Sequence, residues 1–151
     1  MADQLLTWGV RSAHVLGAAF WLGGYAVMLL VFVPYLARER SEPVRELALA
    51  TARIISFSGA LTIVAGLVLI WRTRGYSFIL LGGEWGGIVV ACFVLAFAMM
   101  GVGDNGLRLA LRRLDPESPA SVGPVRRWAM IGLGLGVVAL MMMTRAIYAR
   151  S

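Results

Sequence analysis

Four long apolar stretches alternate with short polar segments along the chain. They cover residues of about 5–36, 53–71, 85–106 and 126–148. Each is close to or longer than the ~20 residues that an α-helix needs to cross the hydrocarbon core of a bilayer. The pattern therefore predicts an all-α integral membrane protein, a bundle of four transmembrane helices that forms a single membrane domain over residues 1–151.

Proline and polar residues predict where these helices end. We expect Pro34 to bend or end the first helix, and Ser41-Glu42-Pro43 is typical of a helix start. Residues 107–114 alternate leucine with arginine, which predicts an amphipathic extension of the third helix in the headgroup region. Residues 115–124 contain three prolines and are expected to form a loop.

Composition agrees with a membrane protein. Hydrophobic residues make up 60% of the chain, and the mean hydropathy is +0.80. The single cysteine, Cys92, excludes an internal disulfide. No basic segment precedes the first apolar stretch, so we expect no cleaved signal peptide.

The basic residues indicate an orientation. All fourteen are arginines, and the formal net charge of +6 is interpreted as a topology signal rather than as a nucleic-acid-binding surface. Nine lie in the two loops at one end of the predicted bundle, which places those loops in the cytoplasm and both termini on the outer, periplasmic side. These nine are Arg38, Arg40, Arg45, Arg53, Arg108, Arg112, Arg113, Arg126 and Arg127.

Each predicted hairpin opens with the same dipeptide. Trp8-Gly9 begins the first hairpin, and Trp85-Gly86 begins the second. This correspondence hints at two hairpins arranged as a parallel repeat.

His14 is the only histidine, and it lies within the first apolar stretch. A histidine at membrane depth is costly, so we expect it to face protein or a bound group. Helical spacing puts Gly17, Ala18 and Trp21 on its face, where small residues would let a neighbouring helix or a flat cofactor approach. A simple hydrogen bond from His14 to another helix remains the alternative.

Two other soft ligands fall at the same predicted depth. His14, Cys92 and Met142 each lie about 9–10 Å below an aromatic residue near the outer surface, at ~1.5 Å per residue. Imidazole, thiolate and thioether together would suit copper, whereas imidazole alone would suit haem iron. Cysteine and methionine are also ordinary fillers of apolar interiors.

Two arginines bear on that choice. Arg11 and Arg145 lie one helical turn closer to the outer surface than His14 and Met142. Guanidinium groups there would repel a copper ion but attract the propionates of haem. Both arginines would also suit a role in which they only reach to the membrane interface.

Signals for catalysis are weak. Carboxylate pairs at membrane depth, a phosphate-binding loop and a multi-histidine motif are all missing, and one histidine excludes a four-histidine, two-haem cytochrome. Asp104 falls near the inner surface, where we expect it to pair with Arg108. We expect the chain not to be an enzyme by itself.

The run from His14 through Phe20-Trp21-Leu22-Gly23-Gly24 to Val33-Pro34 resembles the first helix of the copper-resistance-protein-D (CopD-like) membrane family. That resemblance implies a bacterial inner-membrane protein associated with copper uptake or redox-active haem. The position of His14 is also similar to that in HemJ-type protoporphyrinogen oxidases. Those enzymes use a lysine in a later helix, and this chain has no lysine, which argues against an oxidase.

Two classes of function remain open. The first is a small membrane protein that binds b-type haem, or copper, in electron transfer or copper handling. In the haem case, iron would be ligated by His14 alone, by His14 and a methionine, or between two protomers of a homodimer. The second is a non-catalytic accessory subunit of a larger membrane complex, with no cofactor of its own.

Overall fold

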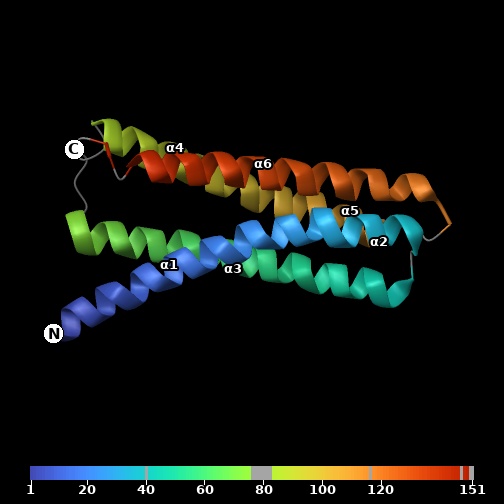
Figure 1. Ribbon diagram of the computed structural model, residues 1–151, viewed down its shortest axis with the longest axis horizontal. Coiled ribbons are helices and arrows are strands. Elements are labelled where there is room, and N and C mark those ends of the chain that lie inside the picture. Colours follow the sequence, from blue (N-terminus) through green and yellow to red (C-terminus); the bar gives the residue numbers. More distant parts are fainter. Residues whose placement is uncertain (40, 76–82, 116, 147, 150–151) are drawn as a thin grey trace.

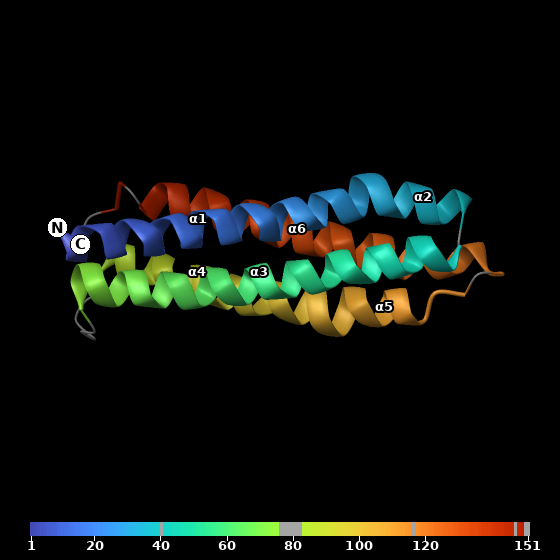
Figure 2. The ribbon, with the colours of Figure 1, turned by 90° about the horizontal axis from the view of Figure 1, so that it is seen from below.

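The structure is a computed structural model that describes residues 1–39, 41–75, 83–115, 117–146 and 148–149. Four long helices run up and down side by side, and the two ends of the chain lie at the same end of the bundle (Figures 1 and 2). We call this the termini end, and the opposite one, with residues 38–39, 41–42, 112–115 and 117–119, the loop end. The elements in order are α1 (Ala2–Val27), η1 (Met28–Phe32), α2 (Val33–Arg38), α3 (Glu42–Arg74), α4 (Glu84–Gly101), η3 (Val102–Leu107), α5 (Arg108–Arg112), η4 (Pro119–Ser121) and α6 (Val122–Ala146).

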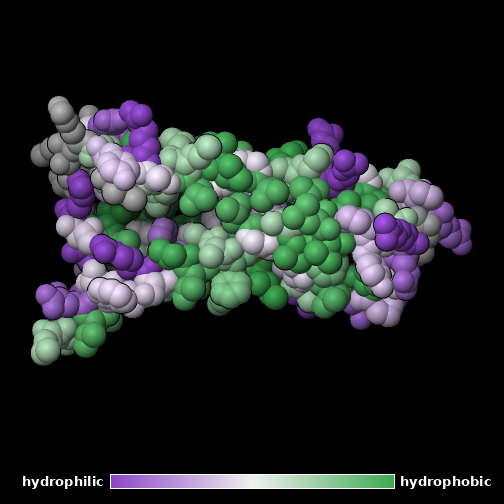
Figure 3. Space-filling model, in the orientation of Figure 1, coloured by the Kyte–Doolittle hydropathy of each residue, from purple (hydrophilic) through white to green (hydrophobic). Residues whose placement is uncertain are grey.

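The four-helix prediction is confirmed, and the chain is a multi-pass membrane protein. Four helical segments are long and apolar enough to span a bilayer, at residues 2–38, 42–74, 84–112 and 119–146. On the face seen in Figure 3, apolar side chains cover the middle, with polar ones gathered towards the two ends. Phe57, Val94 and Phe97 are each more than 60% exposed, as expected where lipid rather than protein covers a helix.

The second helix begins eleven residues before its predicted start. It starts at Glu42, so most of the polar segment before Arg53 is helical rather than a linker. Ser41 is the N-cap residue and Pro43 lies in the first turn, as the Ser-Glu-Pro sequence indicated. The arginines and glutamates that follow are good helix formers, and Arg45 pairs with Glu42 on the helix surface.

The expected amphipathic extension after the third helix is present in the structure. Residues 108–112 continue the helix, and Leu107 and Leu111 are completely buried. The apolar face of this amphipathic segment therefore packs on the bundle, and its polar face is left at the surface. The fourth helix begins at Val122, within the predicted loop, because Pro124 fits the first turn, where no N–H donor is needed.

The helix ends carry two smaller differences. The fourth helix ends at Ala146, two residues before its predicted end, and residue 147 lies outside the described residues. Arg40 and Arg150, which entered the count of arginines, also lie outside them.

Each hairpin contains a π-helical segment in its first helix. Pro34 does not end the first helix; the chain widens into η1 just before it and continues to Arg38. A proline ring clashes with the carbonyl four residues earlier, and the wider π turn relieves that clash. The second segment, η3, has no proline but contains Gly103 and Gly106. This shared feature extends the hairpin correspondence suggested by the two Trp-Gly pairs.

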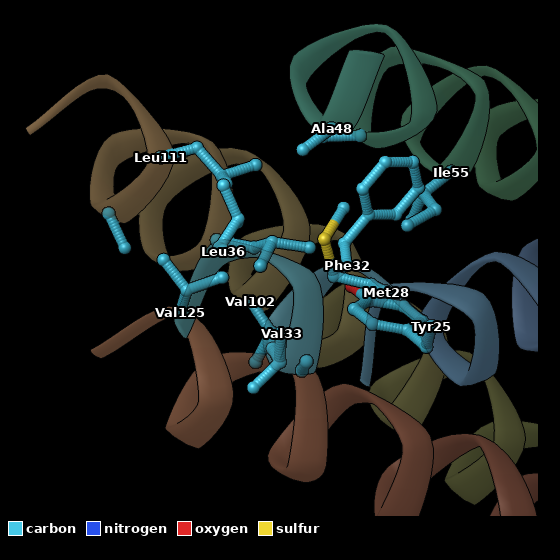
Figure 4. Packing of buried hydrophobic residues seen from close by; sticks show 14 of the residues in the cluster. Tyr25, Met28, Phe32, Val33, Leu36, Ala48, Ile55, Val102, Leu111 and Val125 are labelled. Carbon is cyan, nitrogen blue, oxygen red and sulfur yellow. The ribbon is translucent and has the colours of Figure 1, made fainter. Parts of the chain in front are cut away.

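The most tightly buried part of the core lies towards the loop end. Tyr25, Met28, Phe32 and Leu36 of the first helix meet residues of the other three helices there (Figure 4). The largest fully buried side chains are Tyr25, Met28, Leu36, Ile55, Leu107, Leu111 and Val125. Towards the termini end, side chains such as Val15, Phe20 and Leu140 are more than half exposed.

Tyr25 joins the two hairpins. Its hydroxyl donates a hydrogen bond to the Met99 carbonyl oxygen at 2.7 Å, and its ring packs against Gly103 and Gly132. The side chain is completely buried. One residue of α1 thus contacts α4, η3 and α6 at once.

We expect Tyr25→Phe to destabilise the bundle only modestly, by about 0.5–1 kcal/mol. The ring and its packing stay, and the Met99 carbonyl keeps the backbone N–H of Val102 as a donor. Thermal unfolding of the purified protein in detergent would measure this. A loss as large as that of a core truncation, ~3–5 kcal/mol, would contradict it.

Candidate functional site

His14 projects from α1 onto α3. Its Nδ1 lies 2.8 Å from the backbone oxygen of Thr62, and its Cε1 atom lies close to Gly66. A carbonyl oxygen only accepts hydrogen bonds, so Nδ1 is the donor in this contact. Nε2 has no hydrogen-bond partner among the described residues, and in the tautomer with the proton on Nδ1 it carries the free lone pair. The half-buried ring is therefore oriented by one nitrogen and left open at the other.

The small-residue face beside His14 is occupied by a helix. A methyl group at Gly17 would lie 2.7 Å from Thr62 Oγ1, and one at Gly24 would run into the Ile55 side chain. Of the two alternatives for the small residues beside His14, a neighbouring helix rather than a flat cofactor lies against Gly17, because α3 fills that space. These glycines allow the two backbones to approach closely.

Trp21 also belongs to the α1–α3 contact. Its side chain is 4% exposed, and its ring lies directly on Gly59. Its Nε1–H is buried and has no hydrogen-bond partner in the described part of the chain. Trp21 is thus a core residue that holds one unpaired donor, seven residues from His14 on the same helix.

Cys92 and Met142 lie in the other hairpin. The Cys92 sulfur is 4.0 Å from the Ala139 oxygen of α6, and half-buried Met142 follows Ala139 by three residues. Because α1 packs mainly on α3, and α4 mainly on α6, the structure does not bring Cys92 to His14. The residues with described positions contain no cluster of three or more His, Cys, Asp or Glu side chains able to hold a metal.

The two arginines at the termini end differ in their partners. Arg145 forms an ion pair with Glu84 of α4, with Nη2 2.7 Å from Oε1. Arg11 is exposed and lines a cavity of about 350 Å³ together with Asp3, Gln4, Thr7 and Trp8. Arg11 lies one turn beyond His14, as predicted. Of these two arginines, it is the one without an ionic partner among the described residues.

Arg72 was not singled out by its sequence pattern. It reaches from the end of α3 to α1, where it pairs with Asp3 and donates to Thr7 Oγ1 at 3.1 Å. It therefore closes the α1–α3 hairpin above His14. The signal that could have found it is an acidic residue at the start of the first helix and a basic one at the end of the second.

At the loop end, the predicted Asp104–Arg108 pair is confirmed. Arg108 Nη1 lies 3.3 Å from Asp104 Oδ1, and the same oxygen accepts a 2.6 Å hydrogen bond from Ser56 Oγ of α3. The contact between Asp104 and Arg108 follows from their spacing of four residues on one helix, whereas the hydrogen bond from Ser56 could not be predicted from the sequence.

Comparison with known proteins adds no assignment: no family model matches the sequence, and neither curated proteins nor solved structures contain a significant match.

Proposed function

We propose that this chain is a small membrane redox protein in which Nε2 of His14 ligates the iron of a b-type haem for electron transfer. The observation that carries the proposal is the 2.8 Å contact between Nδ1 and the Thr62 oxygen. Histidine ligands of metals usually donate their second ring nitrogen to a carbonyl or carboxylate, which fixes the ring and raises the basicity of the ligating nitrogen.

The surrounding residues support this role unequally. Thr62 would orient the ring through its backbone, and Gly66 gives the ring its space. Arg11 would pair with a propionate, since it is exposed one turn nearer the termini end. The bound iron would supply one-electron chemistry. We propose no direct contact of Trp21 or Arg145 with the haem, because Trp21 is packed on Gly59 and Arg145 is paired with Glu84.

The separation of the soft ligands favours haem over copper. Cys92 faces α6, and Met142 lies on that helix, whereas His14 faces α3. A copper ion held by all three would require the hairpins to rearrange. A single imidazole is enough to hold haem iron, and a methionine or the His14 of a second copy would supply a second protein ligand.

We place the protein in the bacterial inner membrane with both termini in the periplasm, as the arginine distribution and the CopD-like first helix suggest. The haem would then lie near the periplasmic surface, within reach of an electron partner on that side.

The alternative is an accessory subunit of a larger membrane complex. Gly17, Gly24 and Gly132 are used inside the bundle, but a methyl group added at Gly23 or Gly134 would meet no atom within 4 Å. These open glycines would let a partner helix dock on α1 or α6. Such a subunit would need no cofactor.

Isolation of the protein from its membrane distinguishes the two proposals. The haem proposal predicts a coloured protein with a Soret band and about one haem per chain, or one per two chains if His14 bridges a dimer. Stoichiometric copper without a Soret band would show that the bound group is copper and not haem. A colourless, metal-free protein that co-purifies with a large complex would support the accessory role.

A further inference from the structure

The surface of η3 and α5 at the loop end carries a polar hollow. Asp104, Asn105, Arg108, Leu109 and Arg112 line a cavity of about 270 Å³ there. Four of the five side chains are polar, although the helix towards the termini end is almost entirely apolar. The hollow is therefore placed where the membrane-spanning part of this helix meets the polar loop end.

One guanidinium group in the hollow, that of Arg112, is available to bind an anion. Asp104 is engaged by Ser56 and Arg108, so its negative charge is matched within the cluster. Arg112 is exposed, one turn further on, and has no ionic partner among the described residues. The amide of Asn105 is exposed beside them. The hollow thus presents a net positive group and hydrogen-bond donors, which fit an anion with several oxygens.

We propose that this hollow binds the phosphate headgroup of an anionic phospholipid. Apolar side chains of the same continuous helix, Val90, Val94 and Phe97, are between 45% and 64% exposed and would lie along the acyl chains. Leu109, 41% exposed, provides the apolar wall of the hollow itself. A free phosphate would contact only the polar groups of the hollow. A phospholipid would contact these groups with its phosphate and the neighbouring apolar surface with its acyl chains.

Asp104 is a positioning residue in this site. Its carboxylate holds Arg108 against η3 and ties the segment to Ser56 on α3. Arg108 is therefore fixed at the hollow in the absence of lipid, while Arg112 is free to close on the headgroup. The π-helical geometry of η3 turns Asp104 and Asn105 to the same region of the surface.

The test is lipid selectivity of the full chain in nanodiscs that contain phosphatidylcholine with a minor fraction of spin-labelled phosphatidylglycerol. We expect Arg112→Gln to lower the preference for phosphatidylglycerol over phosphatidylcholine about fivefold, the effect of one basic residue near an anionic headgroup. Arg127→Gln is the matched control, since Arg127 is an exposed arginine at the same end of the bundle but on α6. It should leave most of the preference intact.

Three results would overturn the proposal. One is an equal loss in Arg112→Gln and Arg127→Gln, which would mean general attraction by the basic loop end. Another is displacement of the labelled lipid by millimolar inorganic phosphate, which would assign the hollow to a free anion. Retained binding in Arg112→Gln together with unchanged thermal unfolding would equally exclude Arg112 as the headgroup ligand.

Discussion

Replacing Gly132 by alanine is expected to undo the packing between the two hairpins. An alanine Cβ at this position would lie 2.6 Å from Tyr25 Cζ, closer than two non-bonded carbon atoms approach each other. The Tyr25 ring cannot move away, because it is completely buried and meets Gly103 on another helix. Either α6 shifts outward or Tyr25 leaves its place, so we expect a loss of about 1–3 kcal/mol or more in the free energy of unfolding.

Gly134→Ala is the matched control for this substitution. Gly134 lies on the same helix two residues further on, and a Cβ there meets no atom within 4 Å. It should be neutral or slightly stabilising, because alanine favours the helix by up to ~1 kcal/mol. Thermal unfolding in detergent, followed by tryptophan fluorescence, measures both variants. Equal melting temperatures for the two would show that the Tyr25–Gly132 contact does not hold the hairpins together.

The hydropathy pattern was sufficient to predict the four spanning helices, because length and apolar content are local properties of the chain. It failed between residues 42 and 52, where charged residues made a helix resemble a linker. Hydropathy reports what a segment contacts and not whether its backbone is helical. Helix-forming arginine, glutamate and alanine residues extend α3 beyond its most apolar part.

The two π-helical segments could not be located from periodicity. Pro34 signalled an irregularity, but a proline can end, kink or widen a helix. The outcome depends on neighbouring packing, and here Met28 and Phe32 are buried on both sides of the widened turn. For η3 the sequence contains only glycines and polar residues as a hint.

The candidate site was predictable as a face but not as a set of contacts. Helical spacing correctly put His14, Gly17 and Trp21 on the side of the first helix that faces protein. It could not tell whether a cofactor or another helix lies against Gly17, because that depends on how closely α1 and α3 approach. The stripe of Ser58, Thr62 and Gly66 on α3 supplies the complementary surface.

Ion pairs between residues far apart in the sequence could not be predicted from helical spacing either. Arg145 and Glu84 are 61 residues apart in sequence and meet only because α4 and α6 are neighbours. Their contact leaves Arg11 as the stronger candidate partner for an anionic group near His14.

Replacing His14 by alanine is expected to abolish haem binding altogether, if the proposed function is correct. The chain has no second histidine to replace it. The helix should survive, because the imidazole contributes one hydrogen bond, worth about 1 kcal/mol, to the α1–α3 contact. The Soret absorbance of purified His14→Ala should therefore fall to background, while its melting temperature stays near that of the apoprotein.

Two further variants separate ligation from general disturbance of the site. Arg11→Gln should weaken haem retention during purification without removing the Soret band, because it would lose a propionate partner but keep His14, the proposed iron ligand. Arg145→Gln is its control, since Arg145 is already paired with Glu84 and should leave retention unchanged. If His14→Ala keeps a normal Soret band, another residue ligates the iron. If wild type and His14→Ala are equally free of haem and copper, the hydrogen bond to Thr62 is the whole role of His14, which then serves the packing of α1 on α3.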